Sequence, residues 1–441
     1  MTRVGMVSLG CPKNQVDAER MLYFLKNDGY EIAYDAAMSD VVIVNTCGFI
    51  QSAKEEAIET ILEFCQLKIE GRIKAVIVTG CLAERYRFEI MAEIPEVDAV
   101  VGIGKNDELS NIIRQIYCDE KVEAFGEKTD LCFDDKRIMS TPGYMAYLKI
   151  AEGCDNHCTF CAIPSIRGGF RSRSIESVVS EAEELAKNGV KELVLIAQDT
   201  SRYGEDLYDE PRLAELLREL SKISDLKWIR TLYLYPERIT DKLLDAFAEC
   251  ENAVPYFDIP LQHCDAEVLK RMGRKGDRKT ISALIKRIRE KIPGAVVRTT
   301  LIAGFPGETE KQFESLCEFV KEVRFDRLGC FAYSAEEGTP AAKLDGQLDE
   351  QTKEHRAQIV YDEQSRIAFA NNEKMIGKTL EVVCEGFDRY AECWFGRSYM
   401  DAPEIDGKVF FTCDEKPNAG DFIKVKINDT LDFDLLGERV D

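Results

Sequence analysis

The sequence predicts an α/β protein of three units: an N-terminal doubly wound parallel sheet, a central partial (β/α)6 barrel, and a small C-terminal antiparallel β-barrel. Three observations predict this arrangement. Short β-branched runs alternate with helical stretches over residues 1–120, and the same alternation resumes over residues 142–373. Short strands separated by Gly, Pro and Asp then fill residues 374–441. A chain of 441 residues has ample length for three such units.

The N-terminal unit is expected over residues 1–120. Strands of this kind that alternate with helices form a parallel sheet with helices on its faces. Residues 121–141 are mostly polar and lack periodicity, so we expect a linker there. The predicted strands are Val4–Leu9, Val41–Asn45 and Ala75–Thr79, and the predicted helices are Val16–Leu25 and Ser52–Cys65.

The central unit, residues 142–373, repeats a strand followed by a helix six times. Helical patterns such as Ile175–Lys187 and Thr280–Ile292 separate the strands, and a helical run near residues 351–373 closes the unit. In such barrels the chemistry lies at the carboxyl ends of the strands. The six predicted strands are Ala146–Ile150, Glu192–Ala197, Trp228–Tyr233, Tyr256–Pro260, Val296–Ala303 and Arg327–Tyr333.

The C-terminal unit, residues 374–441, has the texture of a small barrel of the oligonucleotide-binding kind. About five short strands fit in its length. The clearest are Leu380–Cys384, Cys393–Phe395, Val409–Phe411 and Phe422–Ile427.

Charge and hydropathy restrict the partners. The chain has 58 basic and 80 acidic residues, a net charge of −22. Such a surface argues against indiscriminate or tight nucleic-acid binding and against adhesion to anionic membranes, and it is compatible with a cationic protein partner. No apolar run approaches the roughly 20 residues of a membrane span, and the N-terminus lacks an apolar signal core. We therefore expect a cytoplasmic protein.

Three of the sixteen cysteines lie close together after the first strand of the central unit. Cys154, Cys158 and Cys161 form a CxxxCxxC run within the stretch GCDNHCTFC. Three thiolates on one tight loop can hold three irons of a four-iron cluster and leave the fourth iron open to a small ligand. The alternative is a zinc site with His157 as the fourth ligand, because structural zinc needs four closed ligands.

A second set of three cysteines follows the predicted N-terminal strands. Cys11, Cys47 and Cys81 each come about two residues after a strand, in VSLGC, VIVNTC and VIVTGC. Ligands of open α/β sheets gather beyond the carboxyl ends of the strands, so these thiols should converge and could hold a second cluster. The alternative is three unrelated buried thiols. The other ten cysteines receive no role.

The CxxxCxxC run resembles the signature of the radical S-adenosylmethionine (SAM) superfamily, in which an aromatic residue precedes the third cysteine, here Phe160. The resemblance implies that the open iron binds the amino and carboxylate groups of SAM and that reduction cleaves SAM to a 5′-deoxyadenosyl radical. It also implies contacts to SAM. Gln198 or Asp199 would meet the ammonium group, although Asp199 could instead cap a helix. Gly304, in LIAGFPGE, would lie near adenine or simply form a turn.

The order of the three units is similar to that of the methylthiotransferase family, whose C-terminal barrel is called TRAM. The stretches SLGCPKNQVDAE, NTCGFIQSAKEEAIETI and LIAQDTSRYG resemble its RimO branch. This resemblance implies methylthiolation of the β-carbon of an aspartate in small-subunit ribosomal protein S-twelve. It further implies two four-iron four-sulfur clusters, two SAM molecules and an external electron donor of the flavodoxin or ferredoxin kind. We expect a monomer.

The charge of the C-terminal unit bears on the substrate. Residues 379–441 contain fifteen acidic and seven basic side chains, a net charge of −8. A barrel that grips tRNA should present a basic groove, whereas an acidic barrel suits a basic ribosomal protein. A solvated surface without a partner is the alternative reading of this charge. The rival functions are a tRNA methylthiotransferase and a non-catalytic iron–sulfur protein.

Overall fold

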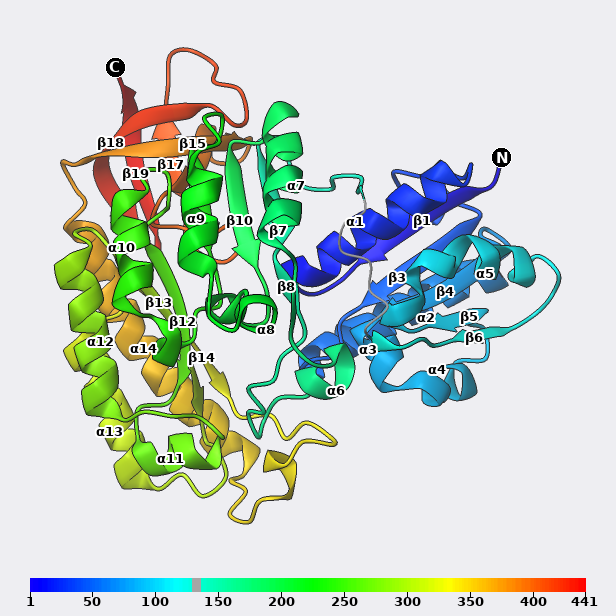
Figure 1. Ribbon diagram of the computed structural model, residues 1–441, viewed down its shortest axis with the longest axis horizontal. Coiled ribbons are helices and arrows are strands. Elements are labelled where there is room, and N and C mark those ends of the chain that lie inside the picture. Colours follow the sequence, from blue (N-terminus) through cyan, green and yellow to red (C-terminus); the bar gives the residue numbers. More distant parts are fainter. Residues whose placement is uncertain (129–135) are drawn as a thin grey trace.

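The computed structural model describes residues 1–128 and 136–441, and its N-terminal unit is a parallel sheet with helices on both faces (Figure 1). Successive residues of the central strands point to opposite faces. Val42 and Val44 pack against α2 on one face, whereas Val41 and Ile43 pack beneath α1 and α5 on the other. The doubly wound sheet predicted from the sequence is therefore confirmed.

The strand order of this sheet is β2-β1-β3-β4-β5-β6, and every described pair is parallel. The chain reverses its direction of winding between β1 and β3, which opens a crevice at the carboxyl ends of these strands. The strands are β1 (Arg3–Ser8), β2 (Glu31–Ile32), β3 (Val41–Thr46), β4 (Ala75–Gly80), β5 (Ala99–Val101) and β6 (Val122–Ala124). The helices are α1 (Pro12–Asn27), η1 (Ala36–Met38), α2 (Gln51–Ile69), α3 (Cys81–Arg85), α4 (Arg87–Glu93), η2 (Ile103–Glu108) and α5 (Leu109–Ile116).

Three of these strands differ from the sequence prediction. β2, β5 and β6 are two or three residues long, too short to produce a periodic pattern. β6 falls within residues 121–141, which the sequence predicts to be a linker, and it pairs with β5 at the edge of the sheet. The linker prediction is wrong for β6, and part of the rest of that stretch, residues 129–135, lies outside the described residues.

The central unit carries six parallel strands in sequential order, β7, β10 and β11 in one sheet and β12, β13 and β14 in a second. An isolated parallel bridge between Ile229 and Ala253 connects the two sheets, so the described strands form a partial barrel. The six predicted strands all appear. Its long helices surround the strands (Figure 1).

The strands of the central unit are β7 (Met145–Lys149), β8 (Ala151–Glu152), β9 (Arg171–Ser172), β10 (Glu192–Ile196), β11 (Trp228–Thr231), β12 (Tyr256–Gln262), β13 (Val296–Ala303) and β14 (Arg327–Ala332). The helices are α6 (Ile163–Arg167), α7 (Ile175–Lys187), η4 (Thr200–Arg202), α8 (Glu205–Tyr208), α9 (Leu213–Ser221), η5 (Pro236–Arg238), α10 (Asp241–Glu249), α11 (Ala266–Arg271), α12 (Arg278–Lys291), α13 (Glu310–Val323), η6 (Ala341–Lys343) and α14 (Glu350–Glu373).

The C-terminal unit is a closed barrel with the strand order β15-β16-β17-β19-β18. All neighbours are antiparallel except β17 and β19, which run parallel. The predicted small barrel is confirmed. The prediction that all its strands pair antiparallel is wrong for β17 and β19. Its strands are β15 (Thr379–Asp388), β16 (Cys393–Ser398), β17 (Val409–Thr412), β18 (Phe422–Leu431) and β19 (Asp434–Val440).

Buried ion pairs attach the C-terminal barrel to the amino ends of the central strands. Arg397 lies 2.7 Å from Glu192, the first residue of β10, and Arg327 at the start of β14 lies 2.6 Å from Asp401. The loop with the three central cysteines follows β8, at the other end of β7. The C-terminal barrel and that loop therefore lie at opposite ends of the central strands. Within the described part of the chain, we find no helix with the length and apolar character of a membrane span.

Candidate functional site

The candidate site lies where the carboxyl edge of the N-terminal sheet meets the carboxyl end of the central barrel. Helix α1 contacts β7, and α3 contacts α6 (Figure 1). Both contacts bring loops that carry predicted cysteines to the junction. The sequence alone places each set at the end of its own strands, and the fold brings the two ends together.

The loop between β8 and α6 holds the central cysteines. Cys154 and Cys158 are buried and Cys161 is half-buried. Backbone hydrogen bonds fix the loop: the Cys161 amide donates to the Cys158 carbonyl at 3.0 Å, and the Thr159 amide donates to Met272 at 2.9 Å. The side chain of His157, by contrast, is exposed. This exposure does not favour the zinc alternative, which would need His157 beside the buried thiols.

Two polar side chains face the sulfur of Cys158 from the barrel. The Tyr235 hydroxyl lies 3.3 Å from Cys158 Sγ, and Arg274 Nη1 lies 3.9 Å from it. The Arg274 guanidinium also stacks over the Tyr235 ring at 4.0 Å from its centroid. A cation beside a sulfur ligand stabilises the thiolate form that binds iron.

The N-terminal cysteines lie at the ends of three neighbouring strands. Cys11 is the N-cap of α1 after β1, Cys47 directly follows β3, and Cys81 begins α3 directly after β4. Because β1, β3 and β4 are adjacent in the sheet, the three thiols share one edge. Electrostatic coupling of Cys81 to both other thiols agrees with this proximity.

Burial raises the pKa of two thiols in each set. It raises the pKa of Cys154 to about 11 and the pKa values of Cys161 and Cys81 to about 12. Burial also raises the pKa of Cys47. Metal binding would therefore release protons, since cysteine binds iron as the thiolate.

Each set consists of three cysteines, the ligand type that holds four-iron clusters. No three His, Cys, Asp or Glu side chains among residues 1–128 and 136–441 are grouped closely enough to hold one metal ion. In a four-iron cluster each thiolate binds a different iron, so the sulfurs stand further apart than around a single ion. The arrangement of three cysteines per set fits such a cluster.

A buried ionic network joins the two sets. Arg167, at the end of α6, lies 3.3 Å from Cys81 Sγ through Nη2, and its Nη1 lies 2.5 Å from Asp17 and 3.1 Å from Glu152. Lys149 pairs with the same two carboxylates. Burial opposes ionisation of Glu152, but the cations Lys149 and Arg167 hold its pKa well below the ordinary range. The network thus fixes α1 and α6 relative to each other.

Lys13 provides a second link across the junction. It lies on α1, two residues after Cys11, and its ammonium nitrogen is 3.6 Å from the centroid of the Tyr233 ring, just beyond β11. Burial opposes the charged form, yet Tyr233 and the nearby Cys11 raise the pKa of Lys13. A buried cation therefore stands beside the N-terminal cysteines.

Among the residues predicted to contact SAM, Gln198 has a free hydrogen-bond acceptor. Its Nε2 donates to Glu152 at 2.6 Å, and its buried Oε1 has no hydrogen-bond partner among the described residues. Asp199 instead accepts from Asn156 of the cysteine loop at 2.8 Å and from Ser201 at 2.5 Å. Its side chain caps no helix backbone. The geometry therefore favours Gln198 as the free acceptor and gives Asp199 a role in holding the loop.

Phe160 and Gly304 occupy different surroundings. Phe160 is half-buried and packs against the core of the central barrel. The Gly304 amide donates to the Glu308 carboxylate at 3.1 Å, and a Cβ at Gly304 would clash with the Lys353 side chain. Thr309 and Gln312 form a capping box on α13 directly after this turn. The turn explains the glycine locally, and a contact between Gly304 and adenine remains a prediction.

Sequence reasoning missed the charged and aromatic partners of the cysteines. They are Lys13, Glu152, Arg167, Tyr235 and Arg274. Lys13, Glu152 and Arg167 lie within six residues of a predicted cysteine ligand, which is the one signal that could have found them. Tyr235 and Arg274 lie more than 70 residues from the cysteines in the sequence, so only the fold reveals them.

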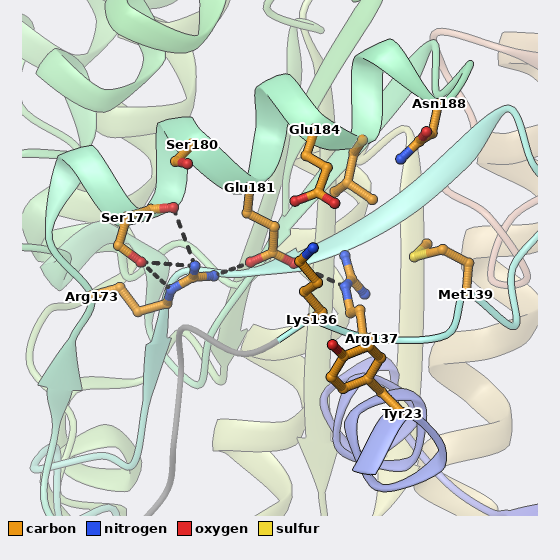
Figure 2. A pocket seen from close by; sticks show the side chains of 11 residues that line it. Tyr23, Lys136, Arg137, Met139, Arg173, Ser177, Ser180, Glu181, Glu184 and Asn188 are labelled. Carbon is orange, nitrogen blue, oxygen red and sulfur yellow. Dashed lines mark hydrogen bonds and ion pairs between the residues drawn. The ribbon is translucent and has the colours of Figure 1, made fainter. Parts of the chain in front are cut away.

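A separate cavity of about 290 Å³ lies between α1, residues 136–139 and α7 (Figure 2). Glu181 of α7 points toward both Arg137 and Arg173, and Arg137 also reaches Glu19 of α1 at 2.6 Å. These pairs connect the N-terminal unit to the barrel. Arg137, Arg173 and Glu181, which line the cavity, are therefore occupied in ion pairs at the joint between the two units.

Comparisons with known proteins agree with this architecture. Family models match the chain as the radical SAM superfamily over residues 148–320, the uncharacterized protein family UPF0004 over 3–102 and the TRAM domain over 376–440. The solved structure of the radical SAM methyltransferase TsrM from Kitasatospora setae shares the fold, with a TM-score of 0.57 at 16% identity over 77% of this chain and 75% of that one.

Full-length relatives are more informative. The ribosomal protein uS12 methylthiotransferase RimO of Thermoanaerobacter sp. (strain X514) is 49% identical over 99% of this chain and 100% of its own length. The protein of the same name from Clostridioides difficile (strain 630) is 48% identical over 99% of both chains. The chain therefore belongs to the RimO family of radical SAM methylthiotransferases.

Proposed function

We propose that this protein methylthiolates the β-carbon of an aspartate in ribosomal protein uS12, with one four-iron cluster held by each cysteine set and two SAM molecules consumed per product. One observation supports the two-cluster arrangement most directly. Ala162, the neighbour of Cys161, and Ile166 pack in one apolar group with Cys81. The two cysteine loops are therefore neighbours across the junction, and a substrate side chain that reached this junction could meet both sets.

The central set is assigned to SAM. A four-iron cluster with one open iron, when bound, supplies the electron that cleaves SAM into a radical able to break an unactivated C–H bond. Cys154, Cys158 and Cys161 would hold it, and the free Oε1 of Gln198 would accept a hydrogen bond from the SAM ammonium. Asp199 and Asn156 keep the loop in position, while Phe160 packs against the core of the barrel.

The N-terminal set is assigned to the second cluster. Cys11, Cys47 and Cys81 would hold it at the edge of the sheet, where no fourth cysteine of the described chain is brought near by the strand order. Lys13 and Arg167 place two positive charges beside this set, which offset the negative charge of three thiolates. The residues that surround the set thus suit an anionic group.

The C-terminal barrel is assigned to binding the part of uS12 that lies away from the modified aspartate. Its net charge of −8 over residues 379–441 complements a protein rich in Lys and Arg and repels tRNA. It is separated from the cysteines by the length of the central strands, about 17 Å for five residues. A ribosomal protein can span that distance, so one end of it could bind the barrel while a loop enters the junction.

The test uses small ribosomal subunits from a strain that lacks this gene. The anaerobically reconstituted protein is mixed with these subunits, SAM and dithionite, and uS12 peptides are read by tandem mass spectrometry. We expect one methylthio group on a single aspartate. The Cys47→Ala variant, treated in the same way, should give none.

Transfer RNA from the same strain serves as the competing substrate. A methylthio group on tRNA with an unmodified uS12 peptide would contradict the proposal and identify a tRNA methylthiotransferase. If SAM and dithionite produce no 5′-deoxyadenosine at all, the protein is a non-catalytic iron–sulfur protein.

A further inference from the structure

One segment of this acidic chain is strongly basic. Residues 270–291 contain ten Lys and Arg side chains and two acidic ones, a net charge of +8 in a chain whose net charge is −22. The segment covers the end of α11, a turn, and α12. These helices lie on the side of the central barrel away from the N-terminal sheet (Figure 1). The charge is therefore concentrated on one outer face.

Part of this charge is already neutralised within the protein. Arg278 lies 2.7 Å from Glu322 and 3.2 Å from Glu318, and Lys291 lies 2.7 Å from Asp245. Asp277 caps α12 by accepting from the Thr280 amide at 2.8 Å. Lys286, Arg287 and Arg289 of α12 also have carboxylate partners, at 3.7, 3.9 and 3.4 Å, so the remaining cations are those on and beside the turn.

Three exposed lysines are left over, Lys270, Lys275 and Lys279. No carboxylate of the described residues lies within ion-pair distance of them, and the nearby exposed acids are Glu237 and Glu267. We call these three lysines, together with the exposed Gly273, the lysine turn. Residues 270–279 contain six Lys and Arg side chains and one acid, Asp277, so the charge of this stretch stays positive when Glu237 and Glu267 are counted as well.

The lysine turn rests directly on the central cysteine loop. The carbonyls of Met272 and Arg271 accept hydrogen bonds from the Thr159 amide at 2.9 Å and from its hydroxyl at 2.8 Å. Gly273 has a φ of +71°, and a Cβ there would stand 3.1 Å from the His157 carbonyl and 3.5 Å from Cys158 Cα. A single layer of backbone thus separates solvent at the turn from a cysteine of the SAM site.

The opposite side of the cysteine loop is occupied by the N-terminal unit and is assigned to SAM and the substrate. There α6 packs against α3 of the N-terminal unit, and the space between the cysteine sets has to admit SAM and the substrate. An electron donor that has to approach the loop while these are bound needs another face. The lysine turn offers one.

An apolar hollow of about 480 Å³ adjoins the turn. It lies between η5 and α12 and is lined by Ile239, Ala283 and Leu284, with Lys275 and Arg287 among the residues around it. An apolar centre with a charged rim is the usual anatomy of a protein–protein interface. A partner could therefore insert an apolar side chain here while its acidic rim meets the lysines.

We propose that the lysine turn is the docking surface for an acidic one-electron carrier protein that reduces the iron–sulfur group of the Cys154, Cys158 and Cys161 loop. This inference rests on the proposed function. In the step one electron leaves the carrier, which is oxidised by one electron, and the iron–sulfur group is reduced by one electron. No bond is formed or broken. Opposite charge would speed and orient the encounter.

Flavodoxin is the probe for the test, because it is an acidic one-electron carrier. The triple variant Lys270→Glu, Lys275→Glu, Lys279→Glu is compared with a control, Lys26→Glu, Lys187→Glu, Lys374→Glu, in which three exposed lysines elsewhere are reversed. Both variants change the net charge by the same amount. Isothermal titration calorimetry of the reconstituted full chain gives the Kd for flavodoxin at low and high salt.

We expect the lysine-turn variant to raise the Kd at least about tenfold at low salt, while the control stays close to wild type. The wild-type affinity should fall with salt, because screening shortens the reach of exposed charges. An equal effect in both triple variants would overturn the proposal, since net charge alone would then explain it. An unchanged Kd for flavodoxin with reduced binding of a short RNA would overturn it as well and identify an RNA surface.

A SAM cleavage assay with two different reductants distinguishes a defect in docking from a defect in the chemical step. Dithionite is small and needs no docking surface, so the lysine-turn variant should release 5′-deoxyadenosine at the wild-type rate with dithionite and slowly with reduced flavodoxin. Equal loss with both reductants would overturn the docking proposal. If wild-type protein cleaves no SAM with dithionite, the proposed function fails, while the Kd comparison still tests the docking surface.

Discussion

The two cysteine sets reach the same junction by different routes. Cys154, Cys158 and Cys161 lie on one loop of eight residues, and local hydrogen bonds fix that loop. Cys11, Cys47 and Cys81 are more than 30 residues apart and meet because three adjacent strands end at one edge. The central cysteines are a local set, which can be recognised from its spacing in the sequence. The N-terminal cysteines are a distributed set, which comes together only because β1, β3 and β4 are neighbours in the sheet.

The surroundings of the two sets also differ. The central set has an aromatic and cationic pair, Tyr235 and Arg274, on Cys158. The N-terminal set has two buried cations, Lys13 and Arg167, and the second of these belongs to the central unit. The distributed set therefore depends on the domain junction for its electrostatic environment, and the local set does not depend on it to the same degree.

The largest effect should come from removing one cysteine of each set. Cys158→Ala should abolish both SAM cleavage and methylthiolation, because the first step depends on the central loop. Cys47→Ala should abolish methylthiolation and keep SAM cleavage, and the iron content should fall from about eight to about four per chain. Iron analysis, 5′-deoxyadenosine release and peptide mass spectrometry measure the three quantities.

Cys118→Ala is the matched control, because Cys118 is exposed and outside both sets. It should retain both activities and the full iron content. If Cys47→Ala also kept about eight irons and formed product, the N-terminal set would be three unrelated thiols. The N-terminal set would then not be a metal site, and its comparison with the central set would be wrong.

The next effect concerns the residue that joins the sets. Arg167→Ala leaves Asp17 and Glu152 buried with one cation fewer, which typically costs about 3–5 kcal/mol of unfolding free energy. For a unit of this size the Tm should fall by at least about 6 °C in calorimetry. Arg167→Lys, which keeps the charge, should recover part of the loss.

Arg366→Ala is the control for this prediction, because its guanidinium is exposed and, among the described residues, pairs only with Glu363. It should change the unfolding free energy by at most about 0.5 kcal/mol. A small effect of Arg167→Ala would show that the two sets are mechanically independent, and the contrast drawn above would lose its basis.

The sequence predicted the elements that carry their own pattern. The six strands of the central barrel and the cysteine loop are long or closely spaced, and the structure contains all of them. It did not predict β2 and β6, since strands of two or three residues leave no periodicity. The contact of Arg167 with Cys81 could not be predicted either, because it joins residues 86 positions apart through the packing of α6 on α3.

The end of the barrel away from the cysteines provides a pH prediction. Glu192 is buried, and although burial opposes its ionisation, Arg397 and Arg230 lower its pKa. A carboxylate with a lowered pKa stabilises the fold above its unfolded pKa of about 4.3, and this contribution is lost as the pH falls through the folded value. The Tm of wild type should therefore decline below about pH 4.3.

Glu192→Gln should lower the unfolding free energy at neutral pH by about 1–3 kcal/mol, because the hydrogen bonds to Arg397 lose their charge. The difference from wild type should narrow as the pH falls. Iron content and SAM cleavage at neutral pH should stay unchanged, since the pair lies at the opposite end of the strands. A lower iron content or slower SAM cleavage in this variant would mean that the C-terminal barrel affects the cysteine loops at the other end of the strands.

An effect of similar size, confined to one ligand contact, tests how the central set binds SAM. Gln198→Ala removes the free Oε1 and the hydrogen bond to Glu152, and a hydrogen bond to a charged group contributes about 1.5–3 kcal/mol. We therefore expect the Kd for SAM to rise at least about tenfold in equilibrium binding, with the iron content unchanged. Gln15→Ala, which removes an amide from α1 that bonds to Ser140, is the control and should bind SAM normally. If Asp199→Asn weakened SAM binding with intact iron while Gln198→Ala did not, the ammonium contact would belong to Asp199. The unpartnered acceptor would then need another ligand.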